Sequence, residues 1–160
     1  MKVIEIKWTG PFTDEEVKGM THESDYGIYQ VYGNHRIYGE NILLYIGQAN
    51  EQRFGVRIPQ HKDWFGWEDA ELKYYIGKIG GENNVSYEEW KLQVNLSESI
   101  LIDYCQPAWN SKGLNGWINE LDAIVFNTGI RRCLPDEINK IHWNKTSLAQ
   151  NNWKAFTPQN

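Results

Sequence analysis

The chain lacks most features that hold small or membrane-bound proteins together. It has only two cysteines, Cys105 and Cys133, without a CxxC spacing or a nearby pair of histidines, which argues against a disulfide framework or a structural zinc site. No apolar run approaches the length of a membrane span. Charges interrupt the apolar stretch at residues 2–8, so a signal peptide is not expected. We therefore expect a cytoplasmic protein with reduced thiols and no membrane partner.

Linkers and positive charge are also scarce. Without repeats, low-complexity tracts or Ser- and Pro-rich stretches, the 160 residues predict a single domain, 1–160. The 16 Lys and Arg against 21 Asp and Glu give a net charge of -5, which by itself disfavours a nucleic-acid partner. Lys and Arg nevertheless outnumber acids in residues 27–62 and 111–160, so a local basic face is compatible with the composition.

What the chain does contain is a series of strand-like runs. Alternating patterns and β-branched or aromatic residues predict strands at 2–8, 27–32, 42–46, 72–79 and 123–126. The runs at 27–32 and 42–46 predict a hairpin with a long polar connection, 33–41. The second run is apolar at nearly every position, which is typical of a strand covered on both faces.

Capping patterns mark the helices. Thr13-Asp14-Glu15-Glu16 and Ser86-Tyr87-Glu88-Glu89 both have the capping-box form, and the second opens a helix that ends before Pro107. Pro135 followed by two acids predicts a short helix. The expected fold is α/β of the α+β type, with a small, mostly antiparallel three-stranded central sheet flanked by helices. A strand and helix precede it (1–25), and a strand and helix extension follows it (113–160).

Glu98 is unusual because its spacing from Val94 and Leu101 places it on the helix stripe that should face the core. A buried carboxylate must pair, bind a metal or stay protonated, because an isolated buried charge is costly. The simpler explanation is a partner Arg from the hairpin side. The more specific one is a metal ligand.

The sequence of the predicted hairpin favours the second explanation, that Glu98 is a metal ligand. Gly27-Ile28-Tyr29 and Tyr45-Ile46-Gly47 lie on the two runs expected to be neighbouring strands, and four further residues follow in order: Arg57, His61, Glu98 and Asn110. Over about residues 26–112 the chain resembles the GIY-YIG nuclease family. The second such tripeptide, Tyr75-Ile76-Gly77, is interpreted as plain strand.

The resemblance implies hydrolysis of a DNA phosphodiester with one divalent ion, Mg²⁺ or Mn²⁺. Glu98 would hold the metal, which suits a hard cation that keeps several waters. Tyr45 would orient or deprotonate the attacking water, a role that needs a nearby cation because a phenol has a pKa near 10. Arg57 would supply that positive field and neutralise charge on the phosphate.

The remaining matched residues would support the reaction. Tyr29 and His61 would organise hydrogen bonds around water and phosphate, and His61 could also carry a proton. Asn110 would brace the site from the loop after the helix. The spacing to Arg57 exceeds the family's usual one, and Pro59 interrupts any regular helix there, so Arg53 is the reserve candidate. The connection 33–41 is a further candidate for DNA contact.

Two other classes of function stay open. A non-catalytic nucleic-acid-binding module of the same fold is the first, and a protein-interaction domain is the second. On pattern alone the tyrosines could be ordinary strand aromatics and the other matched residues ordinary surface or turn residues. If the protein is a nuclease, its specificity is expected from loops, from the C-terminal extension, from a homodimer or from a partner protein.

Overall fold

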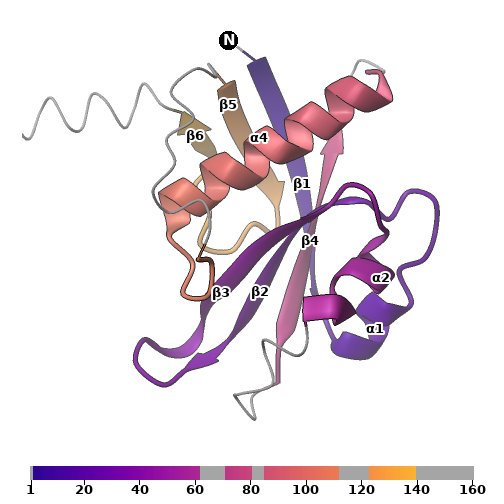
Figure 1. Cartoon of the computed structure of the whole chain (residues 1–160). Helices are drawn as coiled ribbons and strands as arrows, with labels where there is room; N and C mark the ends of the chain where they lie inside the picture. Colours follow the sequence, from indigo (N-terminus) through magenta and orange to yellow (C-terminus); the bar gives the residue numbers. More distant parts are fainter. Residues whose placement is uncertain (1, 62–70, 81–84, 112–122, 140–160) are drawn as a thin grey trace, which may run out of the picture.

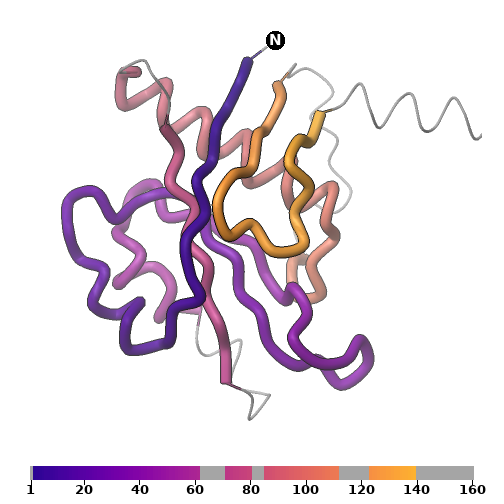
Figure 2. The backbone as a smooth tube through the Cα atoms, turned by 180° about the vertical axis from the view of Figure 1, so that it is seen from behind, coloured from indigo at the N-terminus to yellow at the C-terminus, as the bar shows by residue number. Residues whose placement is uncertain are grey.

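A single mixed sheet of six strands organises the molecule. The computed structural model describes residues 2–61, 71–80, 85–111 and 123–139. The strands lie in the order β3 (Gly39–Ala49), β2 (Gly27–His35), β4 (Lys73–Gly80), β1 (Lys2–Phe12), β5 (Ala123–Gly129) and β6 (Glu137–Asn139). Only β1 and β5 pair in parallel, and the other neighbours are antiparallel. The sheet is strongly twisted (Figures 1 and 2).

The expected three-stranded sheet flanked by helices is therefore wrong. Strands β3, β2 and β4 do pair antiparallel, but β1 covers the far edge of β4 and pairs with β5 on its other side. Alternation in sequence places Ile4, Ile6 and Trp8 on a buried face without saying which strands lie beside them. Figure 2, which views the molecule from behind, shows β1 next to β5, and this pairing brings residues from the two halves of the described chain into one sheet.

Two local expectations also fail. The segment after Pro135 contains strand β6 instead of a helix, because Ile138 is buried and pairs with Val125 of β5. The hairpin connection is short, since β2 and β3 extend until His35 lies opposite Gly39. In both places strand pairing in the sheet outweighs the local sequence signal for a helix or a loop. Parts of the predicted C-terminal extension lie outside the described residues.

The two capped helices begin where the sequence predicts. Helix α1 (Asp14–Lys18) has the full capping box at Thr13, and α4 (Tyr87–Cys105) begins after its N-cap Ser86. Helix α4 ends at Gln106 in the left-handed conformation, just before Pro107. Between them lie α2 (Phe54–Arg57) and the 3₁₀ turn η1 (Pro59–His61). Only α4 is long among the described helices, so strand residues outnumber helical residues in the described part of the chain.

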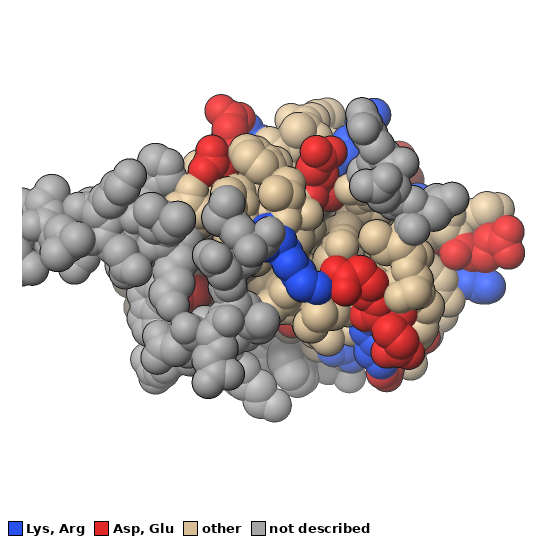
Figure 3. All heavy atoms as spheres, turned by 90° about the horizontal axis from the view of Figure 1, so that it is seen from above, with Lys and Arg blue, Asp and Glu red and all other residues tan. Residues whose placement is uncertain are grey.

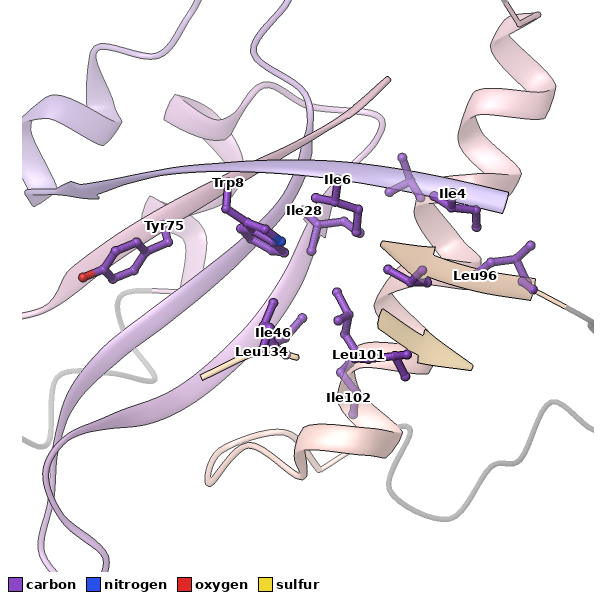
Figure 4. Packing of buried hydrophobic residues seen from close by; sticks show 14 of the residues in the cluster. Ile4, Ile6, Trp8, Ile28, Ile46, Tyr75, Leu96, Leu101, Ile102 and Leu134 are labelled. Carbon is purple, nitrogen blue, oxygen red and sulfur yellow. The ribbon is translucent and has the colours of Figure 1, made fainter. Parts of the chain in front are cut away.

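The helices cover opposite faces of the sheet. Helix α4 lies across one face and packs on a cluster that includes Ile6, Ile28 and Ile46 (Figures 1 and 4). On the other face, Val17 of α1 and Phe54 of α2 pack among residues of β2, β3 and β4. Strands β2 and β3 are therefore covered on both sides, as the unbroken apolar run in β3 predicts.

The described part of the chain contains no helix long and apolar enough to cross a membrane. Cys105 and Cys133 are both free thiols. Burial, together with the nearby Cys133, raises the pKa of Cys105 to about 12, so this thiol stays protonated at neutral pH.

Candidate active site

Two tyrosines from neighbouring strands form the centre of the candidate site. Tyr29 lies opposite Gly47 in the β2–β3 ladder, and Tyr45 lies opposite Val31, so both side chains point to the α2 face. Their ring centroids are 6.1 Å apart. The His61 ring, from η1, lies 5.5 Å from Tyr45, and Phe54 meets Tyr29 edge-on at 6.5 Å. Strand register thus brings the two tripeptides together.

The glycines of the two tripeptides leave room for these rings. A Cβ on Gly47 would lie 2.5 Å from the Tyr29 hydroxyl and 2.6 Å from the Tyr45 ring. Gly27 has a φ of +146°, and a Cβ there would lie 2.3 Å from the backbone oxygen of Gly77. Both positions therefore need glycine because a side chain would displace a tyrosine or the neighbouring strand.

Glu98 reaches the same place from α4. Its carboxylate accepts a hydrogen bond from the backbone N–H of Gln48 on β3, an edge strand of the sheet. Burial raises the pKa of Glu98 to about 7, although the Arg57 guanidinium and the Gln48 N–H act in the opposite direction. The negative charge of this carboxylate adds to burial in raising the pKa of both tyrosines. The β3 edge is where residues from opposite faces of the sheet meet.

Arg57, and not Arg53, is the arginine of this cluster. Its positive charge lowers the pKa of Glu98 and of His61, and it opposes the rise in the pKa of both tyrosines. Arg53 is exposed and serves as the N-cap of α2. The short α2 followed by η1 accommodates Pro59 and still places Arg57 and His61 beside β3. The long spacing in sequence is thus compatible with the site.

The protonation states follow from these surroundings. Burial, then Arg57, lowers the pKa of His61, so the imidazole is neutral at pH 7. Burial, then the Glu98 charge, raises the pKa of Tyr45, and burial raises that of Tyr29 well above its ordinary value. In the protein alone both tyrosines are therefore phenols, despite the nearby Arg57. Their hydroxyls can orient a ligand but are poor bases.

Asn110 braces the site through backbone contacts. Its Nδ2 donates to the carbonyl oxygen of Ile46 at 2.9 Å, and its Oδ1 accepts from the Ile46 N–H at 3.0 Å. The Trp109 N–H donates to the Leu44 oxygen at 2.8 Å. The loop after α4 thus runs along the open edge of β3 and holds the backbone on either side of Tyr45. Asn110 thus holds the backbone of β3 next to Tyr45.

The hydroxyl of Tyr29 is a buried polar group of the cluster that lacks a hydrogen bond within the described residues. Buried hydroxyls usually have a partner, so this one fits a bound water or a substrate oxygen. Within the described ranges no three His, Cys, Asp or Glu side chains gather as a metal cluster. Glu98 is thus a single carboxylate among hydroxyl, imidazole and guanidinium groups.

Two residues that contact the cluster were not predicted from the sequence. Gln48 acts through its backbone N–H, which no side-chain pattern can reveal, although its position directly after the second tripeptide is a clue. Phe54 supports Tyr29 from α2 and also lies 3.3 Å from the Cβ position of Gly27. The tip of the β2–β3 hairpin carries the exposed Ile37 and Tyr38.

Comparison of the chain with known protein families, with curated proteins and with solved structures finds no match in any of the three. The resemblance to GIY-YIG nucleases therefore depends on the order of the matched residues in the sequence alone.

Proposed function

We propose that the protein is a divalent-metal-dependent DNA endonuclease. The observation that carries this proposal is the meeting of five matched side chains from β2, β3, α2, η1 and α4 in one cluster, in which the carboxylate is partly buried: Tyr29, Tyr45, Arg57, His61 and Glu98. Structural roles alone would not require these residue types to converge. Strongly perturbed pKa values beside a specific charge partner are typical of functional sites.

The donor set fits one hard cation. Glu98 would hold Mg²⁺ through a carboxylate oxygen, with the other positions left to water and phosphate. Deprotonated Glu98 is costly in the protein alone, as its pKa of about 7 shows, and a bound cation would offset that cost. When bound, the metal would polarise a phosphate oxygen and stabilise the charge that develops there.

The chain's own residues would then divide the remaining work. Neutral His61 would take the proton of the attacking water, because it can accept a proton at pH 7 whereas Tyr45 remains a phenol. The Tyr45 and Tyr29 hydroxyls would orient water and a phosphate oxygen. Arg57 would neutralise charge on the phosphate.

The proposed hydrolysis of the phosphodiester needs no covalent intermediate with the protein. The water oxygen forms a bond to phosphorus, one P–O ester bond breaks, and the water's proton passes to His61. The leaving oxygen takes a proton from solvent.

A non-catalytic nucleic-acid-binding module of the same fold is the second candidate, and the charge distribution does not distinguish it from a nuclease because both must bind DNA. The net charge is -5, and Figure 3 shows acidic and basic side chains interspersed on the face seen from above, without a continuous basic area. The intact set of reactive side chains speaks against it. Binding without cleavage would distinguish the two candidates.

The deciding experiment is cleavage of supercoiled plasmid and of a branched DNA with Mg²⁺. Native protein, Glu98→Ala and the control Glu88→Gln, which changes an exposed carboxylate on the same helix, are assayed together. We expect nicking or linearisation by native protein and by the control but not by Glu98→Ala. Equal cleavage by all three would indicate a contaminant, and DNA binding without cleavage by any of them would favour the binding module.

A further inference from the structure

A hollow lies at the N-terminal end of α4. It has a volume of about 540 Å³ and combines residues that precede β2, follow β3, end β4 and begin α4. Its lining includes three aromatic residues and several polar ones: Tyr26, Tyr87, Trp90, Glu23, Asn50 and Lys78. None of them belongs to the cluster around Glu98, so the proposed chemistry leaves this hollow unexplained.

The aromatic residues form an open corner. Tyr26 and Trp90 lie edge to face, with ring centroids 6.3 Å apart and planes at 89°, and Tyr87 lies nearly parallel to Trp90 at 5.9 Å. Tyr87 is 57% exposed, and its hydroxyl donates to the Asn50 carbonyl oxygen at 3.2 Å. A large aromatic side chain held in place but left open to solvent is suited to stacking with a flat ligand.

The charges of the lining disfavour a phosphate group. The ammonium of Lys78 is paired with Asp25 at 3.1 Å, and Glu51 is paired with Lys91 at 2.7 Å. Glu23 and the Asn50 side chain add hydrogen-bonding groups to the same lining. A flat, neutral ligand with N–H groups at its edge matches these walls. A nucleobase that is not paired has this chemistry, because its face stacks and its edge offers N–H donors.

The hollow is close to the proposed reaction centre. Trp90 precedes Glu98 by two helical turns on α4, which corresponds to about 12 Å at the rise of an α-helix. The side chain of Asn50 donates both to Gln48 and to Asn95 at 2.9 Å, and the backbone N–H of Gln48 donates to Glu98. A distance of about 12 Å spans three to four base steps of duplex DNA.

We propose that this hollow binds one unpaired nucleobase of the substrate, within about four nucleotides of the phosphate that is cut. The inference rests on the proposed nuclease function and adds the substrate class, DNA with an unpaired base near the cleavage position. Paired duplex cannot offer a base to the hollow without flipping it out, which costs a few kcal/mol. The protein would therefore prefer bulged or branched DNA to perfect duplex.

The test measures binding in EDTA, where no cleavage occurs, by fluorescence anisotropy. Three labelled DNAs are compared: a perfect duplex, the duplex with one bulged guanine, and the same bulge carrying an abasic nucleotide. We expect the bulged guanine to bind about tenfold more tightly than the abasic bulge, since stacking is lost without the base. Equal affinity for the two bulges, or no DNA binding, would overturn the inference.

Substitutions on α4 test whether the preference for the bulged base arises in this hollow. Tyr87→Ala should remove most of the preference for the base, whereas Tyr87→Phe, which keeps the ring, should retain it. The matched control is Tyr104→Ala, which changes another exposed tyrosine (47%, against 57% for Tyr87) at the other end of the same helix. Loss in Tyr104→Ala, or an unchanged preference in Tyr87→Ala, would contradict the assignment. Competition by tetramethylammonium, and not by guanosine, would show that the hollow is a cation cage instead.

These results are independent of the cleavage assay. If native protein fails to cut any DNA with Mg²⁺ but still prefers the bulged guanine in EDTA, the proposed function fails and the base site stands. If it cuts bulged and perfect duplex equally well and binds both bulges equally, the function stands and the base site is refuted.

Discussion

The two halves of the sheet differ in how fully their buried polar groups are hydrogen-bonded. In the half formed by β1, β5 and β6, the indole N–H of Trp8 donates to Asn127 Oδ1 at 2.9 Å, and Asn127 Nδ2 donates to the Pro135 oxygen at 2.9 Å. In the half formed by β2, β3 and α4, the Tyr29 hydroxyl, Gln30 Nε2 and Ser97 Oγ are buried without hydrogen bonds. The buried polar groups of the first half are thus satisfied within the fold, whereas these three atoms of the second half have no partner among the described residues.

The largest expected effect is that of Glu98→Gln. Losing the metal ligand should reduce cleavage about a hundredfold or more, because the charge stabilisation it supports is worth several kcal/mol. The same change should stabilise the protein by about 1–3 kcal/mol at pH 8, since the buried charge disappears. Urea unfolding of both proteins, with circular dichroism as the readout, measures the second effect.

The pH dependence of that gain has a defined sign. The pKa of Glu98 is about 7 in the folded protein against 4.5 ordinarily, so its contribution to stability is full below pH 4.5 and is lost as pH rises through 7. The difference between native protein and Glu98→Gln should therefore vanish near pH 4.5. A difference that persists there would show that the side chain acts through packing instead of charge.

The next largest effect is expected in the other half of the sheet. Asn127→Ala leaves the buried Trp8 N–H without an acceptor and should cost about 1–3 kcal/mol of unfolding free energy. Cleavage per folded molecule should not change, because this residue lies on β5. Loss of activity in fully folded Asn127→Ala would show that the half formed by β1, β5 and β6 also contributes to cleavage. Thermal unfolding and plasmid cleavage on the same preparation check both statements.

Metal binding by the protein without DNA should depend on protonation of Glu98. Because a proton competes with the cation for this carboxylate, Mn²⁺ affinity should fall by about tenfold per pH unit below pH 7 and level off above it. Electron paramagnetic resonance of free Mn²⁺ measures this affinity. A flat profile between pH 5.5 and 8 would contradict the assignment of Glu98 as the ligand.

The smallest effect on stability is expected for Tyr29→Phe. The hydroxyl has no hydrogen bond among the described residues, so its removal should change the unfolding free energy by less than about 1 kcal/mol in either direction. Cleavage should nevertheless drop by about tenfold, because the hydroxyl would orient the reactants. A cost of several kcal/mol without an effect on cleavage would make Tyr29 a purely structural residue.

Much of the local structure can be predicted from the sequence because its signals act over a few residues. The capping boxes at Thr13 and Ser86 begin α1 and α4 as predicted, and Tyr75-Ile76-Gly77 is plain strand in β4. The sequence order of the matched residues also corresponds to a cluster in space. The short helix predicted at Pro135 is wrong because pairing with β5 outweighs a local cap signal.

The sequence by itself determined the helix starts, the strand segments and the residue types that gather at the candidate site. Only the tertiary structure decided the six-strand order, the choice of Arg57 over Arg53, and the shift of the Glu98 pKa to about 7. These properties depend on partners far apart in the chain, such as Trp8 and Asn127, or Gln48 and Glu98. Burial and long-range pairing arise only when the whole sheet is assembled, so no local pattern can specify them.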